Sequence, residues 1–256
     1  MKFRLEKERT RTGAFFQATG EMLRLFGETL YWCKASPRNL ASIFKQMSSV
    51  GADSLPIASV MAVFVGMVLA LQTSSQLVRF RSEWIIGAIV GLSLVQELGP
   101  VMTAFLVAGR VGAAIAAEIG TMRVSEEIDA LETLAINPVR FLAMPRLLAC
   151  ALMLPLLTIY VEVIGMSGGA LISQTYADVA PSVYWDVMWG QLTGTMIFKG
   201  LFKSLCFGVI ISTVGCYMGF TTTGGAEGVG VSTTKSVVVS FMLILIANFF
   251  LTRVLL

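Results

Sequence analysis

Histidine is absent from this sequence and charged residues are scarce. Of the 256 residues, 55% are hydrophobic and 14% are charged, whereas about 25% of the residues in an average globular protein are charged. Without histidine the chain has no Ser-His-Asp or Cys-His nucleophile and no histidine ligand for a metal. So few charges cannot cover the surface of a water-soluble domain of this length. We therefore expect most of the surface to face a lipid bilayer.

Cysteine is also rare. The four cysteines, Cys33, Cys150, Cys206 and Cys216, show no C-x-x-C spacing, and three of them lie in apolar runs. Cysteines in such positions are usually small buried side chains rather than redox or metal sites, and we interpret them in this way.

A phosphate-binding loop is missing as well. A P-loop has one glycine directly before its lysine and another five residues earlier, so that backbone N–H groups can cradle phosphates. In the nearest match, residues 228–236, these two positions are Thr234 and Val229. We therefore expect that the chain does not bind ATP itself. We interpret this glycine-rich segment as a flexible loop on the inner side of the membrane.

Long charge-poor runs predict helices that cross a membrane. About 20 helical residues span the hydrocarbon core of about 30 Å. The sequence contains five runs near or above this length, which predicts an all-α integral membrane protein with a single domain over residues 1–256. The five predicted spans are 54–78, 84–109, 141–173, 195–220 and 237–256.

The N-terminal segment, residues 1–50, is the most basic part of the chain. Nine of the 19 lysines and arginines fall within the first 45 residues, which suits an anionic membrane surface better than nucleic acid. A cleaved signal peptide is not expected, because this segment contains no uninterrupted apolar run. Residues 14–34 place large apolar side chains such as Phe16 and Phe26 at approximately helical spacing. This indicates an amphipathic helix in the membrane interface, and a surface helix packed on the rest of the protein is the alternative.

The distribution of positive charge predicts the orientation. With the N-terminus in the cytoplasm, fourteen lysines and arginines lie inside and five lie outside. Because positive residues concentrate on the cytoplasmic side, this favours a cytoplasmic N-terminus and an external C-terminus. The predicted outer loop, about residues 174–191, contains Asp178 and Asp186 but no lysine or arginine, which agrees with this orientation.

The inner loop between spans two and three, residues 110–140, has an amphipathic pattern. Apolar residues recur at three-to-four spacing, Ser125 is a typical residue near a helix start, and Asn137-Pro138 is a typical stop. The pattern predicts a short amphipathic helix on the cytoplasmic side, between the two spans. Such a helix could cover the inner end of the bundle, or it could dock on a cytoplasmic partner.

Several charged residues fall inside the predicted spans. An unpaired charge at the bilayer centre costs at least about 2.5–3.5 kcal/mol, so it normally faces a cavity or a partner. Glu97 lies midway along span two, before a Gly-Pro pair that frees backbone groups. Lys199 and Lys203 share one helix face, which could meet a lipid phosphate or extend to the headgroup region. For Glu162, Arg146 or a lysine of span four are the candidate partners.

Three glycine pairs with G-x-x-x-G spacing indicate close helix packing, either within the bundle or between two protomers. They are Gly87 and Gly91, Gly165 and Gly169, and Gly215 and Gly219.

A series of short motifs between spans two and three resembles the signature of the MlaE/YrbE permease family. These permeases are the membrane subunits of ABC transporters that work with MCE proteins. The motifs agree in order and spacing over about fifty residues. They are ELGPV at 97–101, AGRVG at 108–112, AEIGTMR at 117–123, EIDAL at 127–131, NP at 137–138 and PR at 145–146.

The resemblance implies a homodimeric permease subunit rather than an enzyme, with an N-terminal interfacial helix and five transmembrane helices in one permease domain. It implies a cytoplasmic coupling helix, residues 119–136, on a separate ABC ATPase that binds ATP and Mg, while this chain holds no cofactor. The implied substrate is phospholipid, moved between the bacterial inner membrane and a periplasmic MCE-domain protein. This transport would contribute to outer-membrane lipid homeostasis and lipid asymmetry. A small cytoplasmic STAS-type subunit is a further implied partner, and nucleic acid is not one.

The resemblance also implies site residues, none of them catalytic or metal-binding. Where the family often has arginine before the glutamate of ELGP, this chain has Gln96, so a headgroup contact at that position is not carried over. The implied lipid-binding residues are Glu97, Leu98, Lys203, Leu69, Leu71, Leu77 and Val78. The implied ATPase-coupling residues are Glu118, Met122, Arg123, Glu126, Glu127, Asp129 and Leu131.

Two other functions are compatible with the pattern of residues. An ion-coupled secondary transporter would use Glu97 and Glu162 as proton carriers, although the five predicted spans show no inverted halves. A structural membrane anchor for a peripheral complex would tolerate the neutralisation of Glu97 and Lys203.

Overall fold

The structure is a computed structural model, and it describes residues 11–33 and 40–255, with side chains described from residue 16 onward within these ranges. The basic residues among the first ten positions lie outside the described residues, as do Lys34, Arg38 and Leu256. The basic N-terminal segment that the sequence predicts is therefore only partly covered.

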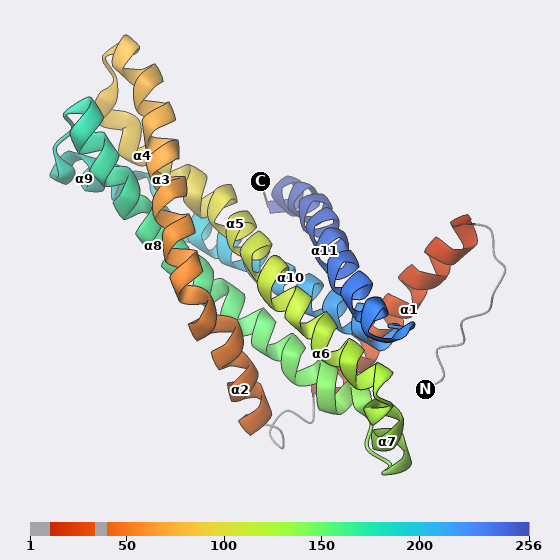
Figure 1. Cartoon of the computed structure of the whole chain (residues 1–256). Helices are drawn as coiled ribbons and strands as arrows, with labels where there is room; N and C mark the ends of the chain where they lie inside the picture. The colour runs from red at the N-terminus through yellow and green to blue at the C-terminus, as the bar shows by residue number, and fades with distance from the viewer. Residues whose placement is uncertain (1–10, 34–39, 256) are drawn as a thin grey trace. The chain divides into compact units, whose positions relative to one another are not determined.

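The regular elements of the described residues are all helical (Figure 1). Three of the short elements, η5, η6 and η7, are π-turns inside or at the start of longer helices. In chain order the elements are α1 (Arg11–Trp32), α2 (Leu40–Gly51), η2 (Ala52–Ser54), α3 (Leu55–Leu77), η3 (Val78–Phe80), η4 (Glu83–Ile85), α4 (Ile86–Ser93), η5 (Leu94–Leu98), α5 (Gly99–Val107), η6 (Ala108–Gly112), α6 (Ala113–Val124), α7 (Glu127–Thr133), η7 (Val139–Ala143), α8 (Met144–Ala177), α9 (Pro181–Gln191), α10 (Gly194–Phe220) and α11 (Gly225–Leu255).

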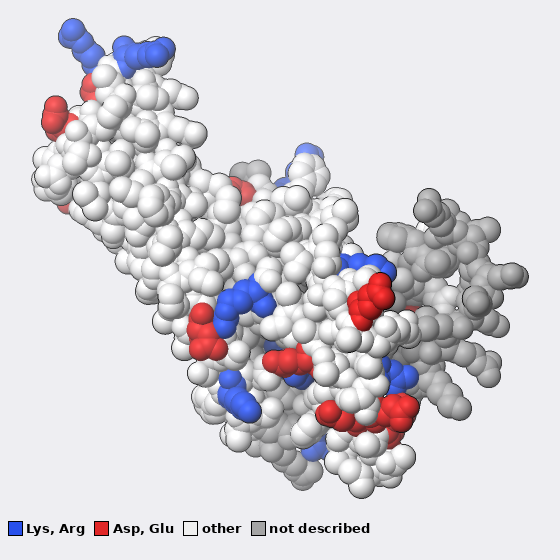
Figure 2. Space-filling view, in the orientation of Figure 1, with Lys and Arg blue, Asp and Glu red and all other residues white. Residues whose placement is uncertain are grey.

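Five helical stretches are long and apolar enough to cross a membrane, which confirms the predicted number of spans. Among them, α3 contains no charged residue, and the surface along this helix is uncharged in Figure 2. Large apolar side chains such as Phe64 and Val60 are exposed on it, as expected for a surface covered by lipid. The five stretches are Leu40–Phe80, Glu83–Val124, Val139–Ala177, Gly194–Phe220 and Gly225–Leu255.

The prediction of a flexible loop at residues 228–236 is wrong. These residues form the first turns of α11, which begins at Gly225. Within them, the hydroxyls of Thr233 and Thr234 donate to the carbonyl of Gly230 at 2.7 and 3.2 Å. A side chain at Gly228 would collide with the backbone carbonyl of Thr223. Glycine at that position therefore permits close packing, and it does not signal a flexible segment.

The chain divides into two compact units. Unit 1 comprises residues 1–48, 108–150 and 209–243, and unit 2 comprises residues 49–107, 151–208 and 244–256. Several helices, including α8, α10 and α11, contribute residues to both. Each unit is described by itself below.

Unit 2 has a core in which α9 packs on α4. Glycine makes this contact possible, because a Cβ at Gly87 would meet the backbone carbonyl of Tyr184 and one at Gly91 would meet the side chain of Met188. The hydroxyl of Tyr184 donates to the carbonyl of Met166 at 3.1 Å. Burial raises the pKa of the Tyr184 phenol, so the group remains a donor. The segment predicted as an outer loop therefore contains a packed helix.

In the same unit, α3 and α8 approach closely at glycines. A Cβ at Gly66 would collide with the backbone carbonyl of Gly165, and one at Gly168 would lie 2.7 Å from the carbonyl of Val63. Nearby, the hydroxyls of Ser59 and Tyr160 share a hydrogen bond of 2.7 Å. The helices touch backbone to backbone, which requires residues without side chains.

Unit 1 contains a similar contact between α6 and α10. Gly215 faces the carbonyl of Gly112, and Gly219 faces the side chain of Ile119. The three glycine pairs predicted from the sequence thus pack within the chain, which decides between the two alternatives left open. The described glycines of each pair meet atoms of neighbouring helices in their own unit.

The helix predicted over residues 14–34 is present as α1. Its Leu25 and Thr29 side chains are buried, whereas Phe16 and Leu23 are exposed. The hydroxyl of Tyr217 donates to Glu21 at 3.2 Å, so one face of α1 packs within unit 1. Its position in the membrane interface remains a prediction.

The cysteines agree in part with their predicted role. All four are free thiols, and Cys150 and Cys216 are buried, but Cys33 and Cys206 are partly exposed. Among residues 11–33 and 40–255, no group of three or more histidine, cysteine or acidic side chains could hold a metal ion.

Candidate functional site

A break in the second span creates the centre of the site in unit 2. Residues Leu94–Leu98 form the π-turn η5, directly before Gly99 and Pro100. Because proline has no N–H, the carbonyl of Gln96, four residues earlier, loses its usual helical donor. The ammonium group of Lys203 replaces it and donates to this carbonyl at 2.9 Å. The Gly-Pro pair thus exposes a backbone acceptor inside the span, as the sequence predicts.

Lys203 also forms an ion pair with Glu97. Its Nζ lies 2.7 Å from Glu97 Oε1 and donates to Thr252 Oγ1 at 2.8 Å. Together with Gln96, these acceptors occupy all three N–H donors of an ammonium group. The side chain of Lys203 is 4% exposed and that of Glu97 is 39% exposed. The carboxylate is therefore the more accessible member of the pair.

Two residues of α11 complete the cluster. Asn248 Nδ2 donates to Glu97 Oε2 at 3.0 Å, and Thr252 Oγ1 donates to Glu97 Oε1 at 2.9 Å. They lie four residues apart, so they share one face of the helix. The sequence analysis missed both. The signal that could have found them is an amide and a hydroxyl at helical spacing in an otherwise apolar span.

Glu162 has none of the partners considered for it. It is 5% exposed, and its Oε1 has no hydrogen-bond partner. Among the described residues, Arg146 pairs with Glu118 at 2.7 Å and Lys203 pairs with Glu97. The expectation that one of these cations balances Glu162 is therefore wrong. The carboxyl group instead lies against Gly99, where an added Cβ would be 2.8 Å from Glu162 Cγ.

An apolar groove lies beside α3 and the second span in unit 2. Of the predicted acyl-chain wall, Leu69 and Leu98 line it. Leu71 and Val78 are exposed elsewhere, and Leu77 packs against the core of the unit, so the structure does not bring the whole predicted set together. The groove has a volume of about 340 Å³ and is lined by Phe64, Val65, Val68, Leu69, Gln72, Leu98 and Met102.

The predicted coupling segment in unit 1 is not one helix. Helix α6 ends at Val124 and α7 runs from Glu127 to Thr133. Between them Glu126 adopts a left-handed conformation with φ of +61°, which turns the chain. Ser125 does not cap α7, because its hydroxyl bonds to the carbonyl of Thr121 at 2.9 Å and to Glu127 Oε1 at 3.0 Å. The backbone N–H of Ser125 still donates to the carbonyl of Thr121 at 2.9 Å, so the left-handed conformation of Glu126 is what interrupts the single helix expected over 119–136.

The short helix α7 buries Ile128 and exposes acidic side chains. Glu126, Glu127 and Asp129 are exposed, and Leu131 and Met122 are partly buried. Arg123 is held by Asp129 in an ion pair of 2.6 Å. Glu118 is held by the buried Arg146, which also donates to the carbonyl of Leu142 at 2.9 Å. Most of the coupling residues implied by the resemblance thus gather around one acidic turn, and three of them, Glu118, Arg123 and Asp129, are already in ion pairs inside the chain.

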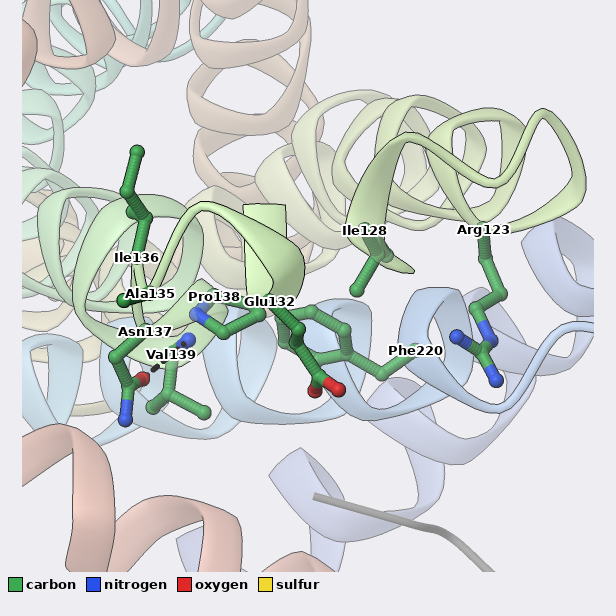
Figure 3. A pocket seen from close by; sticks show the side chains of 9 residues that line it. All are labelled: Arg123, Ile128, Glu132, Ala135, Ile136, Asn137, Pro138, Val139 and Phe220. Carbon is green, nitrogen blue, oxygen red and sulfur yellow. Dashed lines mark hydrogen bonds between the residues drawn. The ribbon is translucent and has the colours of Figure 1, made fainter. Parts of the chain in front are cut away.

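A pocket lies behind this turn (Figure 3). Its volume is about 300 Å³, and Phe220 from the end of α10 projects under α7 in the view. Ile128 and Glu132 come from α7 itself. The lining residues are Arg123, Ile128, Glu132, Ala135, Ile136, Asn137, Pro138, Val139 and Phe220.

The sequence matches the family model described as Permease MlaE over residues 43–254. A probable ABC transporter permease protein of Synechocystis is 47% identical over 214 residues, which cover 84% of this chain and 81% of the relative. A probable ABC transporter permease protein of Rickettsia prowazekii is 42% identical over 217 residues, covering 85% and 84%. The chloroplast protein TRIGALACTOSYLDIACYLGLYCEROL 1 of Arabidopsis thaliana is 38% identical over 231 residues, covering 90% of this chain and 64% of the relative.

Proposed function

Because this chain belongs to the MlaE permease family and is an ABC transporter permease that crosses the membrane several times, we propose that its cargo is phospholipid. Family membership argues against the ion-coupled secondary transporter and the structural anchor. The relative from Arabidopsis is named for a galactolipid, which supports a lipid as the class of cargo.

The observation that carries the proposal is the adjacency of an apolar groove and a charged cluster within unit 2. Leu98 lines the groove, and the residue before it, Glu97, is held by Lys203. A phospholipid combines acyl chains with a charged phosphate, so it matches both halves of this site. Acyl chains would lie along Leu69 and Leu98, and the phosphate would approach the ammonium group of Lys203.

The remaining parts of the transporter are also proposals. A second copy of the chain would complete the lipid cavity, and a separate cytoplasmic ABC ATPase would bind ATP and Mg. A periplasmic MCE-domain protein would exchange lipid with the permease in a bacterial inner membrane, and a STAS-type subunit would accompany the ATPase. The exposed acidic turn of Glu126, Glu127 and Asp129 supports docking on a partner with a basic surface.

A photo-crosslinking amino acid tests the lipid groove. Placed at Leu98, it is expected to capture phospholipid that remains bound after purification in detergent. The matched control is Leu245, an exposed leucine of α11 that does not line the groove. Capture at Leu98 no greater than at Leu245 would refute the groove as the lipid site.

Charge reversal at Glu127 tests the docking surface. Glu127→Arg is expected to abolish co-purification of the ATPase, because it places a cation on the acidic turn without removing a packed side chain. Glu83→Arg, at the start of the second span, is the control and should retain the ATPase. Membrane insertion of both variants should equal that of the wild type. Unchanged co-purification of Glu127→Arg would show that α7 is not the docking element.

A further inference from the structure

A second polar hollow lies in unit 1, where the third candidate span begins at Val139. Its volume is about 340 Å³. The end of α1 contributes Trp32, and the segment from the end of α7 into η7 contributes the other lining residues. They are Ala135, Ile136, Asn137, Arg140 and Phe141.

Arg140 is the only cation among the described residues that line the hollow, and it lies against an aromatic ring. Its guanidinium carbon lies 5.4 Å from the centroid of the Trp32 ring, within the range of a cation–π contact. None of the ion pairs found within residues 11–33 and 40–255 includes Arg140. The five N–H donors of the guanidinium are therefore oriented by Trp32 but not used by an acid.

Asn137 adds a second donor. Its Oδ1 accepts hydrogen bonds from the backbone N–H groups of Val139 and Arg140 at 2.9 and 3.2 Å. These two bonds fix the orientation of the amide and leave its nitrogen free of them. The lining of the hollow thus contains an arginine and an amide, and both types of side chain can donate to phosphate oxygens.

The surroundings of these donors are apolar and exposed. Phe141 and Ile136 are 52% and 40% exposed, and Trp32 also lines the hollow. Aromatic side chains gather at the level of the lipid headgroups, with apolar residues reaching toward the acyl chains. A free anion would contact only the polar donors, whereas a phospholipid would contact the donors with its phosphate and the apolar rim with its acyl chains.

We propose that this hollow binds the phosphate group of a membrane phospholipid. Arg140 and Asn137 donate to the phosphate oxygens, and Phe141 and Ile136 contact the upper part of the acyl chains. The site belongs to unit 1 and shares no residue with the Glu97–Lys203 cluster of unit 2, so it does not depend on the proposed transport.

Native mass spectrometry of the detergent-purified full chain tests the site. Titration with phosphatidylglycerol, compared with a diacylglycerol that has the same chains but no phosphate, measures the phosphate-dependent part of lipid retention. Arg140→Gln is expected to weaken this part at least about tenfold, because a charged hydrogen-bonding partner is lost. Arg140→Lys should give an intermediate loss, and Trp32→Leu a loss of a few fold, since the guanidinium is no longer oriented.

Arg79→Gln is the matched control, because Arg79 is an exposed arginine at the end of another span. It should retain phosphatidylglycerol like the wild type. Lys203 lies outside the hollow, so Arg140→Gln should cause the same fold-loss of phosphatidylglycerol in the wild type and in a Lys203→Met background. Wild-type retention by Arg140→Gln, equal loss of diacylglycerol and phosphatidylglycerol, or displacement of the lipid by millimolar inorganic phosphate would each overturn the proposal.

Discussion

Thr252 forms hydrogen bonds with both charged residues of the cluster in unit 2. Its hydroxyl accepts from Lys203 at 2.8 Å and donates to Glu97 at 2.9 Å, so it lies between the two charges. Asn248 binds the other carboxylate oxygen. Because the cluster is partly withdrawn from water, each of these bonds is stronger than it would be on an open surface.

Lys203→Met tests the coupling of the pair. The substitution leaves Glu97 without its cation. We expect the free energy of unfolding of the detergent-purified chain to fall by about 2 kcal/mol or more, because hydrogen bonds to charged groups contribute about 1.5–3 kcal/mol each. The double variant Glu97→Gln with Lys203→Met should lose less than the sum of the two single variants. Additive losses would show that the two residues act independently.

Single charged residues in apolar runs could be recognised from the sequence, and this is how Glu97 and Lys203 were found. Their pairing could not, because they are separated by more than one hundred residues and only the fold brings them together. The partner expected for Glu162 was wrong for the same reason, since Arg146 is held by Glu118. Asn248 was missed because a neutral amide in an apolar span does not stand out.

At the scale of elements, the sequence does not distinguish a glycine that permits close packing from one that marks a flexible loop. Gly66 permits contact between α3 and α8, and Gly228, in a segment predicted as a flexible loop, permits close packing in the first turn of α11. The spans themselves were predictable, because the thickness of the hydrocarbon core sets their length. Helix α9 was not, since its stability comes from burial of Tyr184 and Met188 rather than from local pattern.

Gly66→Ala and Gly230→Ala make the same change at two helical positions. The new methyl group at position 66 collides with the Gly165 carbonyl, whereas nothing lies within 4 Å at position 230. We expect Gly66→Ala to destabilise the chain by about 1–3 kcal/mol. Gly230→Ala should be neutral or stabilising by up to about 1 kcal/mol. Thermal unfolding in detergent measures both, and equal effects would contradict the close approach of α3 and α8.

At the scale of the whole molecule, family membership and the five spans agree with the sequence analysis. The motifs at 97–146 indicated the family, because they combine a broken span with an acidic turn. The partner proteins, the cargo and the orientation involve molecules beyond one chain, so they stay predictions that need separate experiments.

Cysteine labelling tests the orientation. In a chain whose four cysteines are replaced by alanine, Ser182→Cys in α9 and Ser125→Cys in the α6–α7 turn introduce thiols at exposed positions. With a cytoplasmic N-terminus, a membrane-impermeant maleimide should label position 182 in intact cells. Position 125 should react only after permeabilisation. The reverse pattern would invert the proposed topology.

In the proposed transport, a phosphate that reaches Lys203 finds no vacant N–H, because Gln96, Glu97 and Thr252 already accept all three. Binding must therefore be an exchange, in which the cargo displaces one of these acceptors. Displacing Thr252 breaks a hydrogen bond to α11, and displacing Gln96 leaves its backbone carbonyl in the second span without a donor. Binding of the cargo would then also release one helix, and the acceptor that the phosphate displaces would determine which helix becomes free to move.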